Sequence, residues 1–70
     1  MESNFEQLLS EGAHIILKKQ GGENVIGMKV KVAGESYHGG MYFGTPERLF
    51  SKWDSYMKAF LSALKRKQLN

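Results

Sequence analysis

Two glycine-containing turns divide the middle of the chain into three short segments with the composition of β-strands. Gly21 and Gly22 lie between the first two segments, and Gly34 lies between the second and the third. Glycine adopts positive φ angles without a steric penalty, and the tight two-residue turns of β-hairpins need such angles. Residues 25–32, between the turns, alternate apolar and polar side chains, as a strand does when one face is buried. The pattern therefore predicts a three-stranded antiparallel meander.

The two turns also predict how the strands pair. We expect strands over residues 13–19, 25–32 and 37–43, side by side in that order. The central glycines of the first turn suit a type I′ turn, which pairs Leu17 with Ile26. A type II′ turn with Gly34 at its first central position pairs Val32 with Tyr37. Both pairings place the apolar side chains on one face, whereas a slip of one residue would mix the faces.

Helical patterns flank the predicted sheet. Ser3 and Glu6 have the spacing of a capping box, which predicts a short first helix that ends near Gly12. Thr45 suits the N-cap, and Pro46 the first position, of a second helix that extends to about residue 66. The apolar side chains of that helix recur at helical spacing: Leu49, Phe50, Trp53, Met57, Phe60, Leu61 and Leu64.

These elements predict an α+β fold with the order α-β-β-β-α. Both helices pack on one face of a three-stranded antiparallel sheet whose strand order is 1-2-3. A chain of 70 residues has room for one core, so residues 1–70 form a single small domain. Gly39 faces that core beside Val30 in the predicted register, and we expect a helix to approach the sheet closely there.

The stretch from Gly39 to Thr45 raises the alternative of a phosphate-binding loop. Gly39 and Gly44 have the glycine spacing of the P-loop pattern GxxxxGK[ST], but Thr45 follows Gly44 directly and the lysine is absent. The residues between the glycines are typical of a strand, and the chain is too short for the parallel sheet that carries a P-loop. The stretch therefore predicts a strand that leads into a helix.

Composition excludes several classes of protein. The chain has no cysteine, so it forms no internal disulfide and no thiolate metal site. No apolar stretch approaches the ~20 residues that a membrane-spanning helix needs. We therefore expect a cytoplasmic protein without membrane contact. The formal net charge of +3 is compatible with an anionic partner, although it is small for a dedicated nucleic-acid-binding protein.

The reactive residues of the sequence do not form a catalytic pattern. His14 and His38 lie on the first and third strands with a strand between them, and no carboxylate is placed to orient either imidazole. Two histidines are too few ligands for a metal site. The carboxylates are scattered over turns and helix starts without forming a pair. We therefore expect that the protein is not an enzyme and needs no cofactor, metal or small-molecule substrate.

The sheet face that is turned away from the helices is predicted to be basic, which leaves two interpretations open. It can bind nucleic acid, with Tyr42 stacked on a base and lysines on phosphates. It can also be an ordinary solvated face on which Tyr42 covers Gly27 and Ile16. The candidate nucleic-acid residues, which include the basic end of the second helix, are Lys18, Lys29, Lys31, His38, Tyr42, Lys65, Arg66 and Lys67.

The first strand is a second candidate interaction site because it lies at an edge of the predicted sheet. Edge strands expose unpaired backbone groups that can pair with another chain. The apolar residues of this edge are Ala13, Ile15, Ile16 and Leu17. They can pair with a protein partner or with a second copy of the chain, and dimerisation would help a domain near the lower size limit.

The order of one helix, three strands and one helix in 70 residues resembles the double-stranded-RNA-binding domain. Residues 28–43, with Gly34 in the turn, are similar to the second and third strands of that family. The first turn, residues 20–23, is short and lacks the family's histidine. The second helix begins at residues 46–49 without the family's phosphate-binding lysine cluster. The resemblance therefore implies the fold of that family but not its RNA-binding surface.

A second resemblance involves the ends of the chain. Asn4-Phe5 with Leu8-Leu9, and the sequence Gly-Thr-Pro-Glu-Arg-Leu at residues 44–49, resemble the N-terminal part of PRTRC system protein E. That family belongs to a plasmid cassette, so the resemblance implies a mobile-element context. Two functions follow as predictions. One is a non-catalytic protein-interaction module, such as an accessory or inhibitor protein of a plasmid or phage, and the alternative is a nucleic-acid-binding domain.

Overall fold

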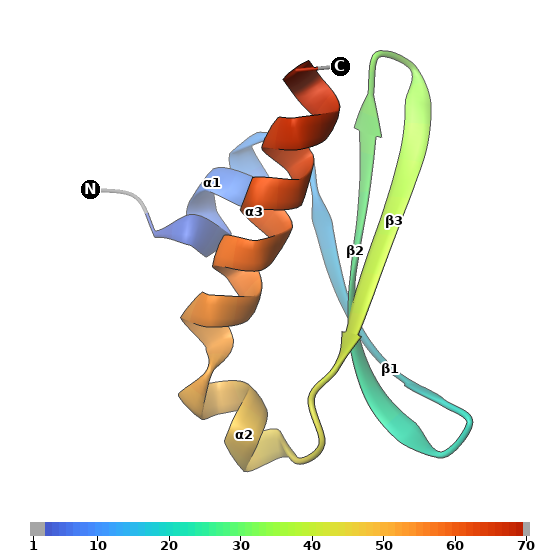
Figure 1. Cartoon of the computed structure of the whole chain (residues 1–70), viewed down its shortest axis with the longest axis vertical. Coiled ribbons are helices and arrows are strands. Elements are labelled where there is room, and N and C mark those ends of the chain that lie inside the picture. Colours follow the sequence, from blue (N-terminus) through green and yellow to red (C-terminus); the bar gives the residue numbers. More distant parts are fainter. Residues whose placement is uncertain (1–2, 70) are drawn as a thin grey trace.

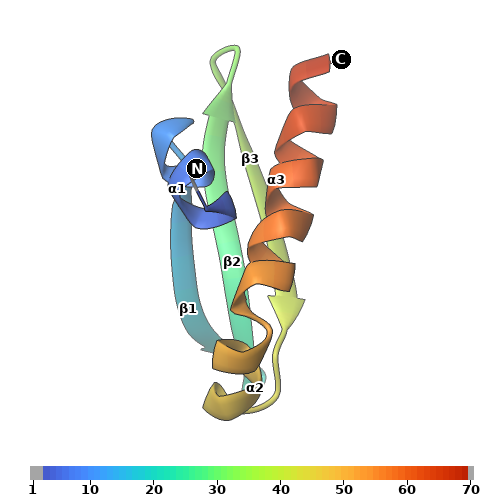
Figure 2. The same cartoon turned by 90° about the vertical axis from the view of Figure 1, so that its left-hand side faces the viewer.

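A computed structural model describes residues 3–69 as a layer of helices on one face of a three-stranded antiparallel sheet (Figure 1). The elements in chain order are α1 (Asn4–Ser10), β1 (His14–Gln20), β2 (Glu23–Val32), β3 (Glu35–Tyr42), α2 (Pro46–Ser51) and α3 (Trp53–Leu69). Seen from the helix side, α1 and α3 both lie in front of the sheet (Figure 2). The strand order is β1-β2-β3, so the predicted α+β fold is confirmed.

The first hairpin has the predicted turn and register. Gly21 and Gly22 have φ angles of 60° and 81°, as both central residues of a type I′ turn require. Leu17 pairs with Ile26, and the ladder continues as far as Gln20 and Glu23 beside the turn. β1 and β2 therefore extend slightly further toward this turn than predicted.

The second hairpin differs from the prediction by two residues. Ala33 and Gly34 have φ angles of 53° and 85°, so they are the two central residues of a type I′ turn. Val32 therefore pairs with Glu35 rather than with Tyr37. The predicted type II′ turn was wrong because Ala33 adopts the left-handed conformation that few residues other than glycine favour. A shift of two residues leaves each side chain on its predicted face but changes its neighbours across the sheet.

The core lies between the helices and the inner face of the sheet, which is the face that the helices cover. Ile26, Met28 and Val30 of the central strand β2 are at most 5% exposed. The ring of Phe60 lies over Gly39, where an added Cβ atom would be 3.8 Å from the ring. The close approach predicted at Gly39 is thus made by a side chain of α3. The helices contribute Leu8, Leu49, Met57, Phe60, Leu61 and Leu64 to this core.

α1 is held by its own cap and by α3. The Glu6 N–H donates a hydrogen bond of 3.1 Å to the Ser3 hydroxyl, and the Glu6 side chain accepts from the Ser3 N–H. The predicted capping box is therefore confirmed. The rings of Phe5 and Trp53 meet edge to face, with centroids 5.4 Å apart. This contact fixes α1 against the first turn of α3.

The second predicted helix is interrupted at Lys52, which separates α2 from α3. The predicted start is confirmed, because Thr45 Oγ1 accepts a hydrogen bond of 3.2 Å from the Arg48 N–H. The Ser51 hydroxyl donates to the Arg48 carbonyl at 3.1 Å. Such bonds from serine to the preceding turn compete with the regular helical pattern and bend helices. One continuous helix was therefore the wrong prediction.

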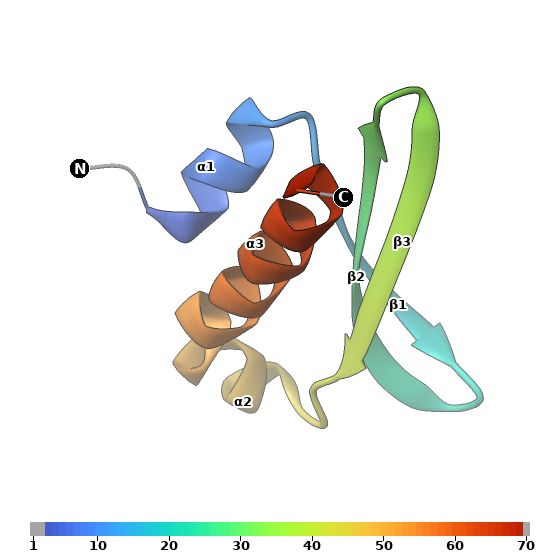
Figure 3. The ribbon, with the colours of Figure 1, turned by 45° about the horizontal axis from the view of Figure 1, so that its top comes forward.

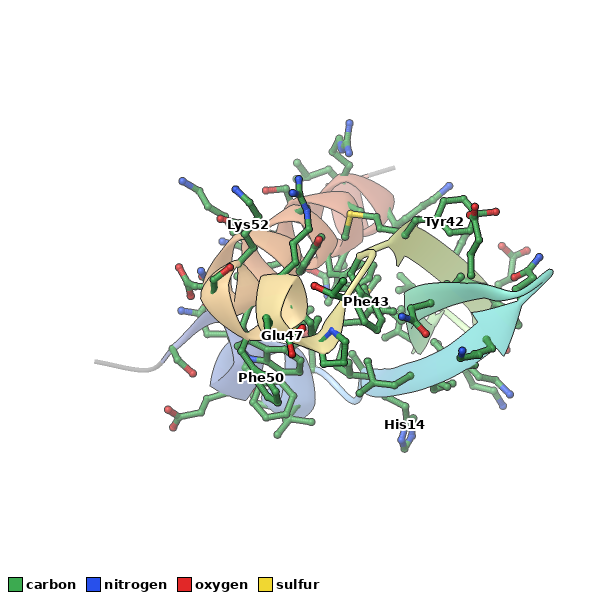
Figure 4. The ribbon with its side chains drawn as sticks, turned by 90° about the horizontal axis from the view of Figure 1, so that it is seen from below. His14, Tyr42, Phe43, Glu47, Phe50 and Lys52 are labelled. Carbon is green, nitrogen blue, oxygen red and sulfur yellow. The ribbon has the colours of Figure 1, made fainter. Side chains whose placement is uncertain are left out.

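The interruption changes which side chains of this region are buried. Leu49 is 4% exposed, whereas Phe50, which was predicted on the apolar side of a continuous helix, is 76% exposed (Figure 4). Beyond Lys52 the helix resumes at a new angle and continues to Leu69, past the predicted end. The apolar side of α3 then faces the sheet along most of its length.

Candidate functional site

β1 is an edge strand that pairs with β2. Its side chains are more exposed than those of β2, since Ile16 is 43% and Leu17 is 56% exposed. Ile15 packs partly against the core, and Ala13 is only 3% exposed. Of the four apolar residues predicted for this edge, Ile16 and Leu17 are therefore accessible, Ile15 is half-buried, and Ala13 is part of the core.

The backbone of β1 presents hydrogen-bonding groups on its free side. In a hairpin with a two-residue turn, the residues beside the turn form a hydrogen-bonded pair, and such pairs alternate along an antiparallel ladder. Gln20, Lys18 and Ile16 therefore bond to β2. The N–H and C=O groups of the intervening residues point toward the free edge: Ile15, Leu17 and Lys19.

The β1–β2 hairpin bends away from the helices toward its turn (Figure 3). Leu17 lies opposite Ile26 on the inner face, yet more than half of its side chain is exposed. The bend accounts for this exposure, because it carries the turn end of β1 away from the helices. An accessible apolar side chain thus lies beside outward-pointing backbone groups on the same strand.

The outer face of the sheet, which is turned away from the helices, carries basic residues in rows across the strands. These rows are Lys18–Val25–Tyr42, Ile16–Gly27–Gly40, His14–Lys29–His38 and Lys31–Ser36. Tyr42 lies beside Val25 and is 63% exposed. The suggestion that Tyr42 covers Gly27 and Ile16 depended on the predicted register, in which Tyr42 lay opposite Gly27, and it does not fit the observed pairing. The interpretation of an ordinary solvated face stays a prediction. Figure 4 shows His14 and Tyr42 on opposite edge strands.

The glycine row leaves a hollow in the outer face. Gly27 pairs with Gly40, and neither has a side chain to fill the space above the strands. Val25 also belongs to the outer face, yet it is only 6% exposed, because Lys18 and Tyr42 flank it in its row. The hollow, which we call the glycine hollow, has a volume of about 460 Å³. Its border includes Ile16, Lys18, Val25, Lys29 and His38.

The basic residues at the end of α3 belong to the other side of the sheet. Lys67 Nζ lies 4.9 Å from the centre of the Tyr37 ring, and Tyr37 pairs with Val30, whose side chain is in the core. The structure thus divides the predicted nucleic-acid residues into two groups. Lys18, Lys29, Lys31, His38 and Tyr42 share the outer face, whereas Lys65, Arg66 and Lys67 lie on α3, over the inner face.

Tyr37 has a raised pKa because of its contact with Glu35. Its hydroxyl donates a hydrogen bond of 2.9 Å to Glu35 Oε2. This bond, together with the negative charge of the carboxylate, raises the pKa of Tyr37 above its usual value of 10.0, because ionisation would break the bond and place two like charges together. The pair lies near the second turn, apart from the glycine hollow.

The remaining polar groups give no basis for a metal site. His14 and His38 flank Lys29 in one row, so β2 separates them as predicted. Within residues 3–69, no group of three or more His, Cys, Asp or Glu side chains could hold a metal ion. No helix in this described part of the chain is long and apolar enough to cross a membrane. The absence of catalysis and the cytoplasmic location stay predictions.

Comparison of the chain with protein-family models, curated proteins and solved structures found no match. The resemblances to the double-stranded-RNA-binding domain and to PRTRC system protein E therefore stay predictions. The functional proposals below rest on the geometry of the two surfaces.

Sequence reasoning missed the glycine hollow. In the predicted register Gly27 lay opposite Tyr42, whose ring would have filled the space. The observed register replaces Tyr42 with Gly40 at that position. The pattern that could have revealed the hollow is the presence of an outward-facing glycine on each of two adjacent strands. That pattern becomes visible only when the second turn is placed at Ala33 and Gly34.

Proposed function

We propose that the chain is a non-catalytic protein-interaction module that binds an extended segment of a partner along the free edge of β1. The observation that carries this proposal is the 56% exposure of Leu17 beside backbone groups that point away from β2. An accessory or inhibitor protein of a plasmid or phage would need no more than such a binding surface.

Strand addition explains how this edge would recognise a partner. Backbone hydrogen bonds to the outward groups of β1 would supply affinity, and side-chain contacts would supply specificity. Leu17 would contact apolar side chains of the partner on the inner face, and Ile16 would contact them on the outer face. Lys18 and Lys19, which follow in the strand, favour a partner with acidic residues near that end.

β3 is the other edge strand, but its features favour β1 as the binding edge. The middle of β3 is Gly39-Gly40, which offers no side chain for recognition. Phe60 already lies over Gly39, and Lys67 lies over Tyr37. β1 instead carries two accessible aliphatic side chains next to one another. A partner segment would therefore gain more apolar contact on β1.

The test compares partner capture by two variants. Leu17→Pro removes an N–H that points to the free edge, so it leaves the ladder with β2 intact. Phe50→Ala removes an apolar side chain that is more exposed than Leu17, at 76% against 56%, and that lies on another surface. Each affinity-tagged protein is recovered from its source cells and its bound proteins are quantified by mass spectrometry, after circular dichroism has confirmed the fold. We expect Leu17→Pro to lose the main bound protein and Phe50→Ala to retain it.

Two results would contradict the proposal. Retention of the same bound proteins by Leu17→Pro would show that binding does not use the β1 edge. Recovery of a monomer without any bound protein would argue against an interaction module. Sedimentation of the purified chain shows whether it forms a dimer. If it does, and if Leu17→Pro dissociates that dimer, the occupant of the edge is a second copy of the chain.

A further inference from the structure

We propose that the glycine hollow and its basic border bind single-stranded nucleic acid, with a base in the hollow and phosphates on the lysines of the outer face. This site is distinct from the free edge of β1, and the argument for it does not depend on the proposed protein partner. It rests on the shape of the outer face, on the charge around the hollow, and on the position of a second hollow beside the first.

The shape of the hollow suits a flat, apolar group. Its floor is the backbone of the Gly27–Gly40 pair, and Ile16 and Val25 supply apolar contact at its border. The ring of Tyr42 lies next to Val25 and is largely exposed. A nucleobase has a flat face that stacks on apolar and aromatic surfaces in a way that tolerates any sequence. The hollow therefore fits a base better than it fits a phosphate.

The charge around the hollow suits the backbone of a nucleic acid. Lys18 borders the hollow in the row on one side, and Lys29 and His38 border it in the row on the other side. The two rows are separated by four residues along each strand, or about 13 Å at 3.3 Å per residue. The register also places Glu23 on this face, opposite Gln20 in the row beyond Lys18, whereas none of the described residues between the two basic rows is acidic. Charge complementarity thus favours an anionic ligand across the hollow.

A second hollow indicates a polymer rather than a single nucleotide. It has a volume of about 570 Å³ and lies beyond Lys29, between His14, Lys31 and Ser36. Lys29 borders both hollows, so basic groups and open spaces alternate along the strand direction. A single-stranded nucleic acid presents bases and phosphates in a similar alternation. A duplex hides its base faces in the stack and would leave the hollows empty.

The site can be tested by blocking the hollow without changing the charge. An added Cβ atom at Gly40 would lie 3.6 Å from Val25 Cγ1, an ordinary contact, so the backbone accepts a side chain there. Gly40→Thr would place a branched side chain over the floor of the hollow, where a base would lie, and keeps strand propensity high. A second variant, Lys18→Gln with Lys29→Gln, removes charge from both sides of the hollow.

A matched control changes the charge elsewhere by the same amount. Lys65→Gln with Arg66→Gln removes two positive charges from α3, over the inner face. Binding of a labelled single-stranded DNA of about ten nucleotides is measured by fluorescence anisotropy at two salt concentrations, with a duplex of the same length for comparison.

We expect the wild-type protein and the control to bind the single strand more tightly than the duplex. Gly40→Thr should weaken binding at least tenfold, and the outer-face lysine variant should also lower the salt dependence. An equal loss of affinity in the outer-face lysine variant and in the α3 control would show non-specific electrostatic attraction and overturn the proposal. Unchanged affinity in folded Gly40→Thr, tighter binding of the duplex, or no binding at low salt would overturn it as well. If Gly40→Thr does not fold, the comparison of the outer-face lysine variant with the α3 control still decides whether the outer face binds the single strand.

Discussion

Lys67 lies over the aromatic ring of Tyr37, with its Nζ atom 4.9 Å from the ring centre. This contact joins the last turns of α3 to the edge strand β3. Gln68 makes a second connection at the same end, because its side-chain amide donates a hydrogen bond of 3.0 Å to Glu11 just after α1. Lys67 and Gln68 therefore hold the end of α3 against β3 and against the segment after α1, on the helix side of the sheet.

The contact between Lys67 and Tyr37 should contribute measurably to stability. A cation over an aromatic ring at an exposed site contributes about 0.5–1 kcal/mol. We expect Lys67→Ala to lower the free energy of unfolding by about that amount. Urea denaturation measures the change, and Lys65→Ala serves as a control of the same residue type. An equal loss of stability in both variants would mean that the charge on the helix, rather than the contact with the ring, stabilises the fold.

The raised pKa of Tyr37 predicts a specific response to removal of its partner. Glu35→Gln removes the carboxylate that holds the tyrosine proton, so the pKa of Tyr37 should fall toward its usual value. Tyrosinate absorbance during an alkaline titration measures the change, and Tyr37→Phe identifies the transition among the three tyrosines. Superimposable curves for wild type and Glu35→Gln would contradict the assigned hydrogen bond.

The same shift links folding to alkaline pH. Because the folded-state pKa of Tyr37 exceeds the unfolded value of about 10.0, the folded protein holds this proton more tightly. The contribution is therefore fully present below pH 10 and is lost as the pH rises through the raised folded-state pKa. Thermal unfolding across this range should show a smaller alkaline decrease in Tm for Tyr37→Phe than for the wild type.

The second turn predicts a stabilising substitution. Ala33 has a φ angle of 53°, which is costly for alanine, whereas Asn-Gly is a preferred pair in type I′ turns. We expect Ala33→Asn to raise the free energy of unfolding by about 0.5–1 kcal/mol. Denaturant unfolding provides the measurement. A loss of stability would instead favour the type II′ turn, in which residue 33 has an extended backbone.

Two adjacent leucines of α1 should differ sharply in their importance. Leu8 is fully buried, whereas Leu9 is 50% exposed. Leu8→Ala should cost about 2–5 kcal/mol because it leaves a cavity in the core. Leu9→Ala should cost about 0.5 kcal/mol or less, as surface substitutions usually do. Denaturation of both variants checks the contrast, and similar losses would mean that α1 packs through a different face.

The parts of the fold that the sequence predicted depend on local chemistry. The capping box at Ser3, the turn at Gly21 and the helix start at Thr45 each involve residues close together in the chain. The alternation in residues 25–32 predicted which face of β2 is buried, and a shift of two residues in the partner strand could not change it. These local patterns were enough to predict the fold class.

The errors arose where a choice depended on neighbours distant in the chain. The position of the second turn requires Ala33 to adopt an unfavourable conformation, which only the pairing of whole strands can impose. The interruption at Lys52 is an exception, because it accompanies the hydrogen bond between Ser51 and Arg48 within one turn; it leaves Phe50 exposed. The glycine hollow and the exposure of Leu17 depend on register and on the bend of the first hairpin.

The central claim is that the free edge of β1 receives a partner strand. Amide hydrogen exchange along β1 tests this claim most directly. In the free protein, the amides of Ile15 and Leu17 should exchange rapidly, because they point away from β2, while those of Ile16 and Lys18 should be protected. In the complex recovered with the partner, Ile15 and Leu17 should become protected as well. Rapid exchange of these two amides in the complex, with new protection on another surface, would contradict the account.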